Sequence, residues 1–312
     1  MKPDKTPILV TGAHRTGTTW VGKMLTAGGQ AGYISEPFNL LHRTGVFRAK
    51  VTHWYTYVCE ENEEDYLASL RETLAFRYHI WSEIKSLRSF KDGGRMLRDG
   101  WAFLQGRLRA QRPLVKDPFA VFSIPWFIER LGSQVVVTVR HPAAFASSLL
   151  RLDWPFQIED LLAQPLLMRD WLSPYREEME ALRKAPDDIL AQGCLLWRMI
   201  YNVVAEMRNK YAADVLRVVR HEDLSLDPVG GFRDLYTMLG LQFGPAVEGQ
   251  ILKSSSVENP QELSRKRVHA TQLDSKANLE NWKRRLTPEQ IKRVRQHTEQ
   301  AAQVYYPELS WE

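Results

Sequence analysis

Cationic and hydroxyl side chains follow a short apolar stretch near the start of the chain. Arg15-Thr16-Gly17-Thr18-Thr19 comes after an apolar run at 8–10 and before a stretch with helical spacing. A strand, a glycine-containing loop and a helix in that order direct backbone N–H groups at one spot, which favours a phosphate or sulfate. Gly17 permits close approach of the backbone, and Arg15 adds a fixed positive charge. This loop therefore predicts an anion site.

The spacing Gly12-x-x-x-x-Gly17-Thr18-Thr19 resembles a phosphate-binding P-loop, with one departure. Thr18 stands where nucleoside triphosphatases have a lysine, whereas Thr19 keeps the hydroxyl position. Without that lysine we do not expect the loop to neutralise a β/γ-phosphate pair, and a single terminal phosphate suits it better. The alternative is an ordinary β–α turn that happens to contain glycine and threonine.

A second pair of anion-binding side chains follows the most apolar strand expected in the chain. Arg140 comes directly after that strand, and Ser148 lies eight residues further on, in the expected next helix. An arginine and a hydroxyl beside a helix N-terminus form a monoanion site. The alternative is an arginine paired with a carboxylate and a serine packed among alanines. Two such sites on one sheet indicate a nucleoside with phosphates at both ends.

These stretches together resemble the sulfotransferases that use 3′-phosphoadenosine 5′-phosphosulfate (PAPS). The segment Arg15-Thr16-Gly17-Thr18-Thr19-Trp20 resembles their 5′-phosphosulfate loop, and the segment at 136–142, with Ser148, resembles their 3′-phosphate motif. Ser35-Glu36-Pro37-Phe38 is similar to a Glu-Pro element of carbohydrate sulfotransferases. His221-Glu222-Asp223-Leu224 and Trp282 resemble further family elements, so the resemblance extends over nearly the whole chain.

The resemblance implies PAPS as the sulfate donor, 3′,5′-ADP as the product and no metal. Trp20 and His221 would lie near the adenine, and Lys276 carries over from the loop that covers the nucleotide. The residues implied in nucleotide binding are Arg15, Thr16, Gly17, Thr18, Thr19, Trp20, Arg140, Ser148, His221 and Lys276.

The catalytic residues implied by the resemblance are Glu36, Arg15 and Lys116. Cytosolic members have a catalytic histidine two residues after the lysine, but this chain has Pro118 there. We therefore expect Glu36 to act as the base, and Arg15 and Lys116 to stabilise the leaving group. Alternatively, the Glu36 carboxylate caps a helix or pairs with Arg43. His53 is the second choice for the base, ahead of His14, His141 and His221, each of which is expected to be structural or a binding contact.

Strands alternate with helices along the chain, which predicts an α/β fold with three layers: a central parallel sheet, helices on both faces and a P-loop-like nucleotide site. The strands are expected at 8–11, 32–35, 113–116, 134–139 and 215–219. Long helices are expected at about 63–81, 159–184 and 187–211. No linker divides the chain, so we expect one domain over 1–312 with a helical, aromatic insertion at about 38–110. The aromatic rings at 38–60 line an acceptor pocket or fill a secondary core.

Composition narrows the class of protein. The chain has 312 residues, of which 44% are hydrophobic and 25% charged, with a net charge of +5, and this fits a globular protein with an anionic ligand. Its two cysteines form no C-x-x-C pattern, so neither a zinc site nor a disulfide framework is expected. A polar N-terminus and the absence of a long apolar run predict no membrane span and a cytoplasmic protein.

The remaining alternatives differ in what they require. The second hypothesis, a P-loop kinase or NTPase, requires a lysine at position 18 and a strand that ends in aspartate. The chain has Thr18 in place of the lysine, and its most apolar strand ends in Arg140. A nucleic-acid-binding protein requires a basic stripe with aromatic residues, and the cluster at 265–267 is too short. The resemblance to carbohydrate sulfotransferases implies a carbohydrate, glycosylated or other small-molecule acceptor as the partner. The oligomeric state stays open.

Overall fold

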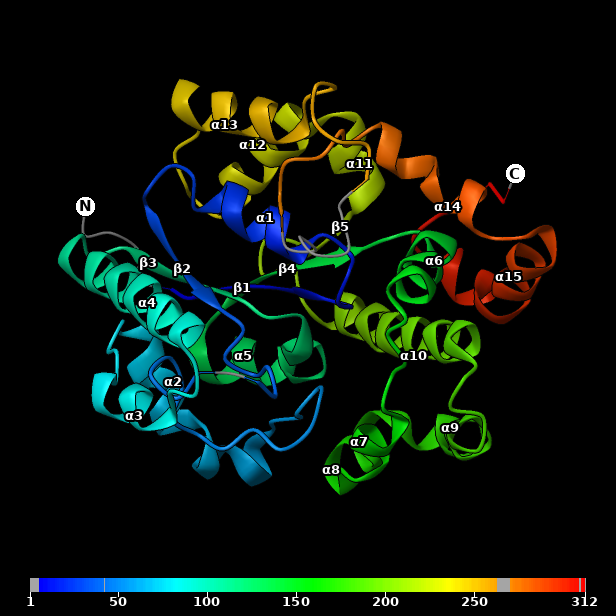
Figure 1. The fold of residues 1–312 in the computed structure, drawn as a ribbon, viewed down its shortest axis with the longest axis horizontal. Coiled ribbons are helices and arrows are strands. Elements are labelled where there is room, and N and C mark those ends of the chain that lie inside the picture. The colour runs from blue at the N-terminus through cyan, green and yellow to red at the C-terminus, as the bar shows by residue number, and fades with distance from the viewer. Residues whose placement is uncertain (1–5, 42, 263–269, 309, 312) are drawn as a thin grey trace.

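Five parallel strands form one sheet in the order β2-β3-β1-β4-β5 (Figure 1). The computed structural model describes residues 6–41, 43–262, 270–308 and 310–311, so the basic cluster at 265–267 lies outside the described residues. The strands are β1 (Ile8–Gly12), β2 (Ala31–Ser35), β3 (Arg112–Lys116), β4 (Gln134–Val139) and β5 (Leu216–Arg220). All five lie within one or two residues of the predicted ranges, and the predicted parallel sheet is confirmed.

The sheet has a hydrophobic core on each face because successive side chains of a strand point to opposite sides. Ile8 and Val10 of β1 pack in one core with residues of α1, α12 and α13, whereas Leu9 packs in the other with residues of α5 and α10. Figure 1 shows these helix groups on opposite sides of the sheet. Every residue of β1 and β3 is buried, as expected for inner strands of a covered parallel sheet.

Helices fill the connections between the strands and form the chain after β5. They are α1 (Thr18–Leu25), α2 (Leu67–Leu74), α3 (Ile80–Ser86), α4 (Phe90–Leu108), α5 (Ile124–Leu131), α6 (Pro142–Leu152), α7 (Ile158–Leu162), α8 (Pro165–Leu167), α9 (Arg176–Arg183), α10 (Ile189–Lys210), α11 (His221–Leu226), α12 (Pro228–Met238), α13 (Pro245–Ser255), α14 (Asn281–Arg285) and α15 (Pro288–Ala302). In the described part of the chain, no helix is long and apolar enough to cross a bilayer.

Two of the predicted long helices are wrong. The pattern at 63–81 is divided because α2 ends at Leu74. Phe76, directly after the C-cap residue Ala75, has a left-handed φ of 53°, and the N–H of Arg77 donates to the carbonyl of Glu72. This is a helix C-cap with phenylalanine in place of the usual glycine. The pattern at 159–184 is divided into short helical pieces, since Pro165 and Pro174 each lack a backbone N–H and clash with the preceding turn.

The insertion between β2 and β3 carries α2, α3 and α4, and its aromatic residues form a core. Phe38, Phe47 and Tyr55 are fully buried in the same cluster that covers one face of the sheet. Of the two alternatives for the rings at 38–60, the structure therefore supports the core. The aromatic acceptor wall expected from this segment is not formed by these rings.

Candidate active site

The loop between β1 and α1 depends on two glycines with positive φ. Gly12 has φ 132°, and a Cβ there would lie 2.3 Å from the carbonyl oxygen of Thr138 on the neighbouring strand. Gly17 has φ 100° and precedes α1 directly, and a Cβ there would lie 2.7 Å from Nδ1 of His221. A side chain at either position would clash with these atoms, so the tight turn of the loop requires glycine. The turn places the N-terminus of α1 at a cavity that Gly17 and the first residues of α1 line.

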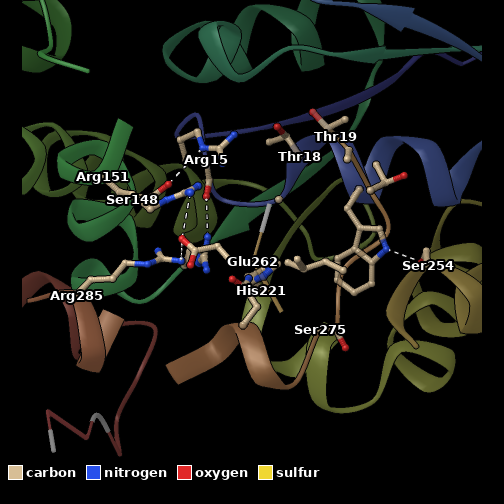
Figure 2. A pocket seen from close by; sticks show the side chains of 17 residues that line it. Arg15, Thr18, Thr19, Ser148, Arg151, His221, Ser254, Glu262, Ser275 and Arg285 are labelled. Atoms are coloured by element: carbon tan, nitrogen blue, oxygen red, sulfur yellow. Dashed lines mark hydrogen bonds and ion pairs between the residues drawn. The ribbon is translucent and has the colours of Figure 1, made fainter. Parts of the chain in front are cut away.

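The three threonines of this loop have different positions. The Thr16 hydroxyl is buried, donates to the carbonyl of Ala13 at 2.6 Å and lies 2.8 Å from the Thr138 hydroxyl. It braces the loop against β4 and does not line the cavity, which changes the role expected for this side chain. Thr18 and Thr19 do line the cavity (Figure 2).

The anion pair after β4 meets the β1–α1 loop. Nε of Arg15 donates to the Ser148 hydroxyl at 3.3 Å, and Nη1 of Arg140 donates to the Arg15 carbonyl at 3.3 Å (Figure 2). Nε of Arg140 is buried and has no hydrogen-bond partner among the described residues. A buried donor without a partner costs roughly 1–3 kcal/mol, so this guanidinium is suited to an anionic ligand. The three predicted residues Arg15, Arg140 and Ser148 therefore lie together.

Two further arginines join this group. Arg151 of α6 and Arg285 of α14 line the same cavity. Burial, followed by the charges of Arg140, Arg151 and Arg285, lowers the pKa of Arg15 to about 10. Arg15 remains charged at neutral pH, but three neighbouring guanidinium groups repel its charge. Such a concentration of positive charge favours a ligand with several negative charges.

The Glu262 carboxylate lies within this cationic group. Its Oε1 accepts from Nη1 of Arg151 at 3.0 Å and from Nη2 of Arg285 at 2.8 Å (Figure 2). The cavity is only about 120 Å³, below the range of roughly 300–1,000 Å³ that is usual for ligand pockets. A nucleotide that uses these two arginines must therefore displace Glu262.

The other end of the cavity is suited to an aromatic base. His221 and Trp20 face each other edge to face, with ring centroids 5.8 Å apart. Both ring nitrogens of His221 are buried without a partner among the described residues, and burial lowers its pKa well below the ordinary value. A neutral imidazole offers one donor and one acceptor. The Trp20 indole N–H donates to the Ser254 hydroxyl at 2.9 Å, which fixes its ring.

Lys276 does not line the cavity. Its side chain is exposed, whereas the neighbouring Ser275 and Asn278 are buried and line the wall. The segment expected to cover the nucleotide is therefore at the cavity, but through these two residues and not through Lys276.

A second cavity of about 620 Å³ contains Glu36 and Lys116. The Lys116 ammonium donates to Oε1 of Glu36 and forms an ion pair, and the Asn39 amide donates to Oε2 at 2.6 Å. Thr19 lines this cavity as well as the first one. The N-terminus of α1 is therefore the place where the two cavities adjoin.

Asp117 holds the backbone that carries Glu36. Its carboxylate accepts from the N–H of Phe38 at 2.6 Å and from the N–H of Phe119 at 2.9 Å. Burial, followed by the charge of Glu36, raises the pKa of Asp117 to about 7. Asp117 thus ties the turn after β2 to the end of β3, and we regard it as a positioning residue.

A profile of the sulfotransferase domain matches residues 5–305 of the chain. The chain belongs to the sulfotransferase family. Carbohydrate sulfotransferase 1 of Danio rerio is 28% identical over 180 residues, which are 56% of this chain and 37% of that protein. The match therefore spans little more than a third of the relative's length.

The comparison with solved structures finds sulfotransferases. The sulfotransferase domain of the Synechococcus PCC 7002 olefin synthase is 17% identical, with a TM-score of 0.49 and coverage of 99% of each chain. Mouse sulfotransferase SULT7A1, solved in complex with PAP, is 11% identical, with a TM-score of 0.45 and coverage of 96% of this chain and 84% of that one.

Three of the four histidines considered as possible acid–base groups have structural partners in this sulfotransferase. His14 lies 2.7 Å from the Tyr55 hydroxyl, and burial lowers its pKa to about 4. His141 caps α6 by accepting from the Ala143 N–H at 3.1 Å. His53 lies 3.5 Å from Asp160 and lines neither cavity. Where side chains are described, no group of three or more His, Cys, Asp or Glu residues is arranged to hold a metal ion.

Proposed function

We propose that this sulfotransferase transfers a sulfuryl group from PAPS to a hydroxyl of a carbohydrate, glycosylated or other small-molecule acceptor. Family membership supports the reaction class. The single observation that carries the proposal is that Thr19 lines both cavities, so a cationic nucleotide cavity adjoins a cavity that contains Glu36 and Lys116. A donor held in the first cavity can then present its terminal group to an acceptor held in the second.

The residues of the nucleotide cavity have complementary roles in this proposal. The backbone of Gly17 and the hydroxyls of Thr18 and Thr19 bind the 5′ anionic group at the N-terminus of α1. Arg140 and Ser148 bind the 3′-phosphate. Further cationic and aromatic groups of the wall, which complete the phosphate and adenine contacts, are Arg151, Arg285, Trp20 and His221.

Glu36, Arg15 and Lys116 perform the chemistry. The Glu36 carboxylate takes the proton of the acceptor hydroxyl as its oxygen forms a bond to sulfur and the bond from sulfur to the phosphate oxygen breaks. Arg15 and Lys116 stabilise the negative charge that collects on that leaving oxygen. Catalysis of this kind depends mostly on positioning and preorganised charge, as in phosphoryl transfer.

The lining of the second cavity favours an acceptor rich in hydroxyl groups. Its polar side chains include Ser35, Asn39, Gln105 and Gln111, and the described rings at 38–60 do not line it. Together with the similarity of the Glu-Pro element, this favours a carbohydrate. The cytoplasmic location and the absence of a nucleic-acid partner stay predictions from sequence.

Calorimetry tests the proposal. We expect 3′,5′-ADP to bind without metal, and Arg140→Gln to weaken that binding, whereas Arg217→Gln on β5 serves as a matched control away from the cavity. Preference for ATP with Mg²⁺ would instead support the P-loop kinase or NTPase, the reading that requires a lysine at position 18. A transfer assay with PAPS and a panel of sugars then identifies the acceptor.

A further inference from the structure

Helix α4 carries an apolar stripe that no described part of the chain covers. Leu97, Trp101, Leu104 and Leu108 are spaced by four, three and four residues and are 46% to 75% exposed. Residues with this spacing share one face of a helix. Phe103 and Gly106, on the other side of the helix, are buried. The stripe therefore lies on the outer side of the molecule, facing solvent.

The apolar surface continues beyond this stripe. Phe90, at the first position of α4, is fully exposed. The neighbouring helix α3 packs on α4 and exposes Ile80, Trp81 and Ile84. Eight large apolar side chains on two adjacent helices are more than the isolated exposed residues that any soluble surface carries, so this surface indicates an interaction site. We call it the α3–α4 face.

The exposed charges around the α3–α4 face are all positive. Between residues 80 and 110, among side chains that the structure describes, the exposed charged residues are Lys85, Arg88, Arg95, Arg98, Arg107 and Arg109. The carboxylates of the same region are covered. Glu83 is buried and pairs with Arg43, which also contacts Asp92. Asp99 is mostly covered and pairs with Arg98.

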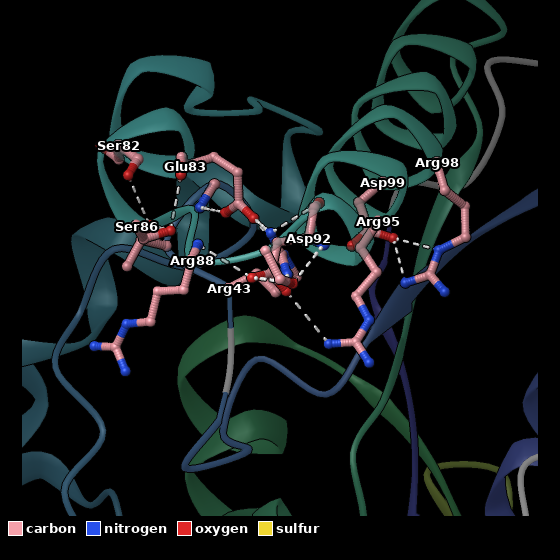
Figure 3. Close-up of polar contacts among 12 residues, drawn as sticks. Arg43, Ser82, Glu83, Ser86, Arg88, Asp92, Arg95, Arg98 and Asp99 are labelled. Carbon is pink, nitrogen blue, oxygen red and sulfur yellow. Dashed lines mark hydrogen bonds and ion pairs between the residues drawn. The ribbon is translucent and has the colours of Figure 1, made fainter. Parts of the chain in front are cut away.

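Figure 3 shows this division of charge. The carboxylates of Glu83 and Asp92 gather on the central Arg43, and the Arg88 guanidinium extends outward. The guanidinium groups of Arg95 and Arg98 lie further along α4, where Arg95 contacts Asp92 at 3.6 Å and Arg98 contacts Asp99 at 2.7 Å. The α3–α4 face therefore presents aromatic and aliphatic side chains with cations beside them and no exposed carboxylate among its described residues.

We propose that the α3–α4 face docks on the surface of an anionic lipid membrane. A helix with Trp, Phe and Leu on one side and basic residues beside them is typical of helices that lie in the membrane interface. Anionic lipid headgroups are complementary to the arginines and lysine, and this complementarity selects the occupant. A second copy of the chain would place two positive faces against each other, which is unfavourable.

Docking in this way also orients the second cavity. Arg95 and Arg98 of α4 contribute to its lining. The rim of the cavity that contains Glu36 would therefore lie close to the lipid headgroups. The docking itself does not depend on the reaction that the cavity catalyses.

Vesicle co-sedimentation of the full chain tests the proposal. We expect the chain to bind vesicles of phosphatidylcholine that contain one third phosphatidylglycerol, and to bind pure phosphatidylcholine vesicles far less. Added salt should weaken the binding, because the attraction to anionic lipid is partly electrostatic. Failure of the folded chain to bind the anionic vesicles would overturn the proposal.

Two variants assign the binding to the α3–α4 face. Trp101→Ser with Leu104→Ser removes the centre of the stripe and should abolish sedimentation, whereas Leu226→Ser with Val304→Ser, at exposed positions elsewhere, should leave it unchanged. Arg107→Gln with Arg109→Gln keeps the stripe and should weaken binding by about fivefold per arginine. Arg208→Gln with Lys292→Gln is the matched charge control.

Two outcomes would contradict the proposal even if the native chain sediments with vesicles. Equal binding by the stripe variant and its control would show that another surface binds the lipid. A native dimer in analytical ultracentrifugation that the stripe variant converts to a monomer would show that a second copy covers the face. Thermal unfolding of each variant verifies that the fold is retained.

Discussion

Glu262 competes with the ligand for two arginines, and replacing it should strengthen nucleotide binding. Its carboxylate accepts from Arg151 at 3.0 Å and from Arg285 at 2.8 Å. Partly exposed ion pairs of this kind contribute about 0.2–1 kcal/mol each. A ligand phosphate that takes both arginines must first break both pairs, so Glu262→Gln should tighten binding by about 0.5–2 kcal/mol, or roughly 2- to 30-fold.

The assay is titration calorimetry with 3′,5′-ADP at low and at moderate salt. Glu262→Gln keeps the size of the side chain and removes only its charge. Glu248→Gln is a matched control, since Glu248 pairs with Arg233 at 3.4 Å and is 41% exposed, against 43% for Glu262. We expect the gain in affinity for Glu262→Gln alone, and a smaller gain at the higher salt concentration, because screening weakens the pairs that are broken.

Weaker binding by Glu262→Gln would refute this reasoning, because it would mean that the carboxylate supports the ligand. Unchanged affinity would mean that Arg151 and Arg285 do not take up a phosphate. Absence of binding to the native chain would contradict the proposed function itself, and it is distinguishable from both results because no variant is needed to observe it.

Two further predictions concern the reaction and the pH dependence of stability. Glu36→Gln should lower turnover by about 10²–10⁴-fold with 3′,5′-ADP affinity kept, and near-normal turnover would remove Glu36 from the role of base. Burial lowers the pKa of His141 to about 4. As the pH falls below about 6.5, His141 is protonated in the unfolded chain but not in the folded chain, so the free energy of unfolding decreases until about pH 4. His141→Asn keeps the helix cap, and its free energy of unfolding should fall by about 3 kcal/mol less than that of the native chain over this pH range, as measured by urea unfolding. The same pH dependence in both proteins would contradict the low pKa of His141.

The residues that follow strands could be predicted from the sequence because a parallel sheet brings its strand ends to one edge. Glu36 follows β2 and Lys116 ends β3, and these strands are neighbours in the sheet. Arg15 follows β1 and Arg140 follows β4, which are also neighbours. Apolar runs locate the strands, so the pairs that form both cavities follow from local pattern and from strand order.

Other parts of the site depend on contacts that no local pattern reveals. Arg151 and Arg285 contact Glu262 only because the chain after α13 folds back over the edge of the sheet. Arg151 lies more than 100 positions before the other two residues in the sequence. The role of Thr16 could not be predicted either. The left-handed φ of 68° at Arg15 turns the Thr16 hydroxyl into the protein, and an arginine does not indicate that conformation as a glycine would.

The same left-handed Arg15 leads to a prediction about stability. A non-glycine residue there costs about 1–2 kcal/mol. Burial and neighbouring guanidinium groups lower its pKa from 12.5 to about 10, a penalty of about 3 kcal/mol on the charged side chain. The hydrogen bond to Ser148 and the contact with the Trp154 ring, 5.8 Å away, offset about 1–2 kcal/mol of this cost.

Arg15→Gly should therefore stabilise the ligand-free chain by about 2–4 kcal/mol while it abolishes nucleotide binding, since Arg15 is unfavourable for folding and favourable for function. Arg15→Ala removes the charge but keeps the strained backbone, so it should gain less. Ala110→Gly, at an exposed residue with φ 50°, measures the backbone contribution alone. Denaturant unfolding gives all three values. A glycine variant less stable than the native chain would show that the contacts of Arg15 outweigh both its strain and its crowded charge.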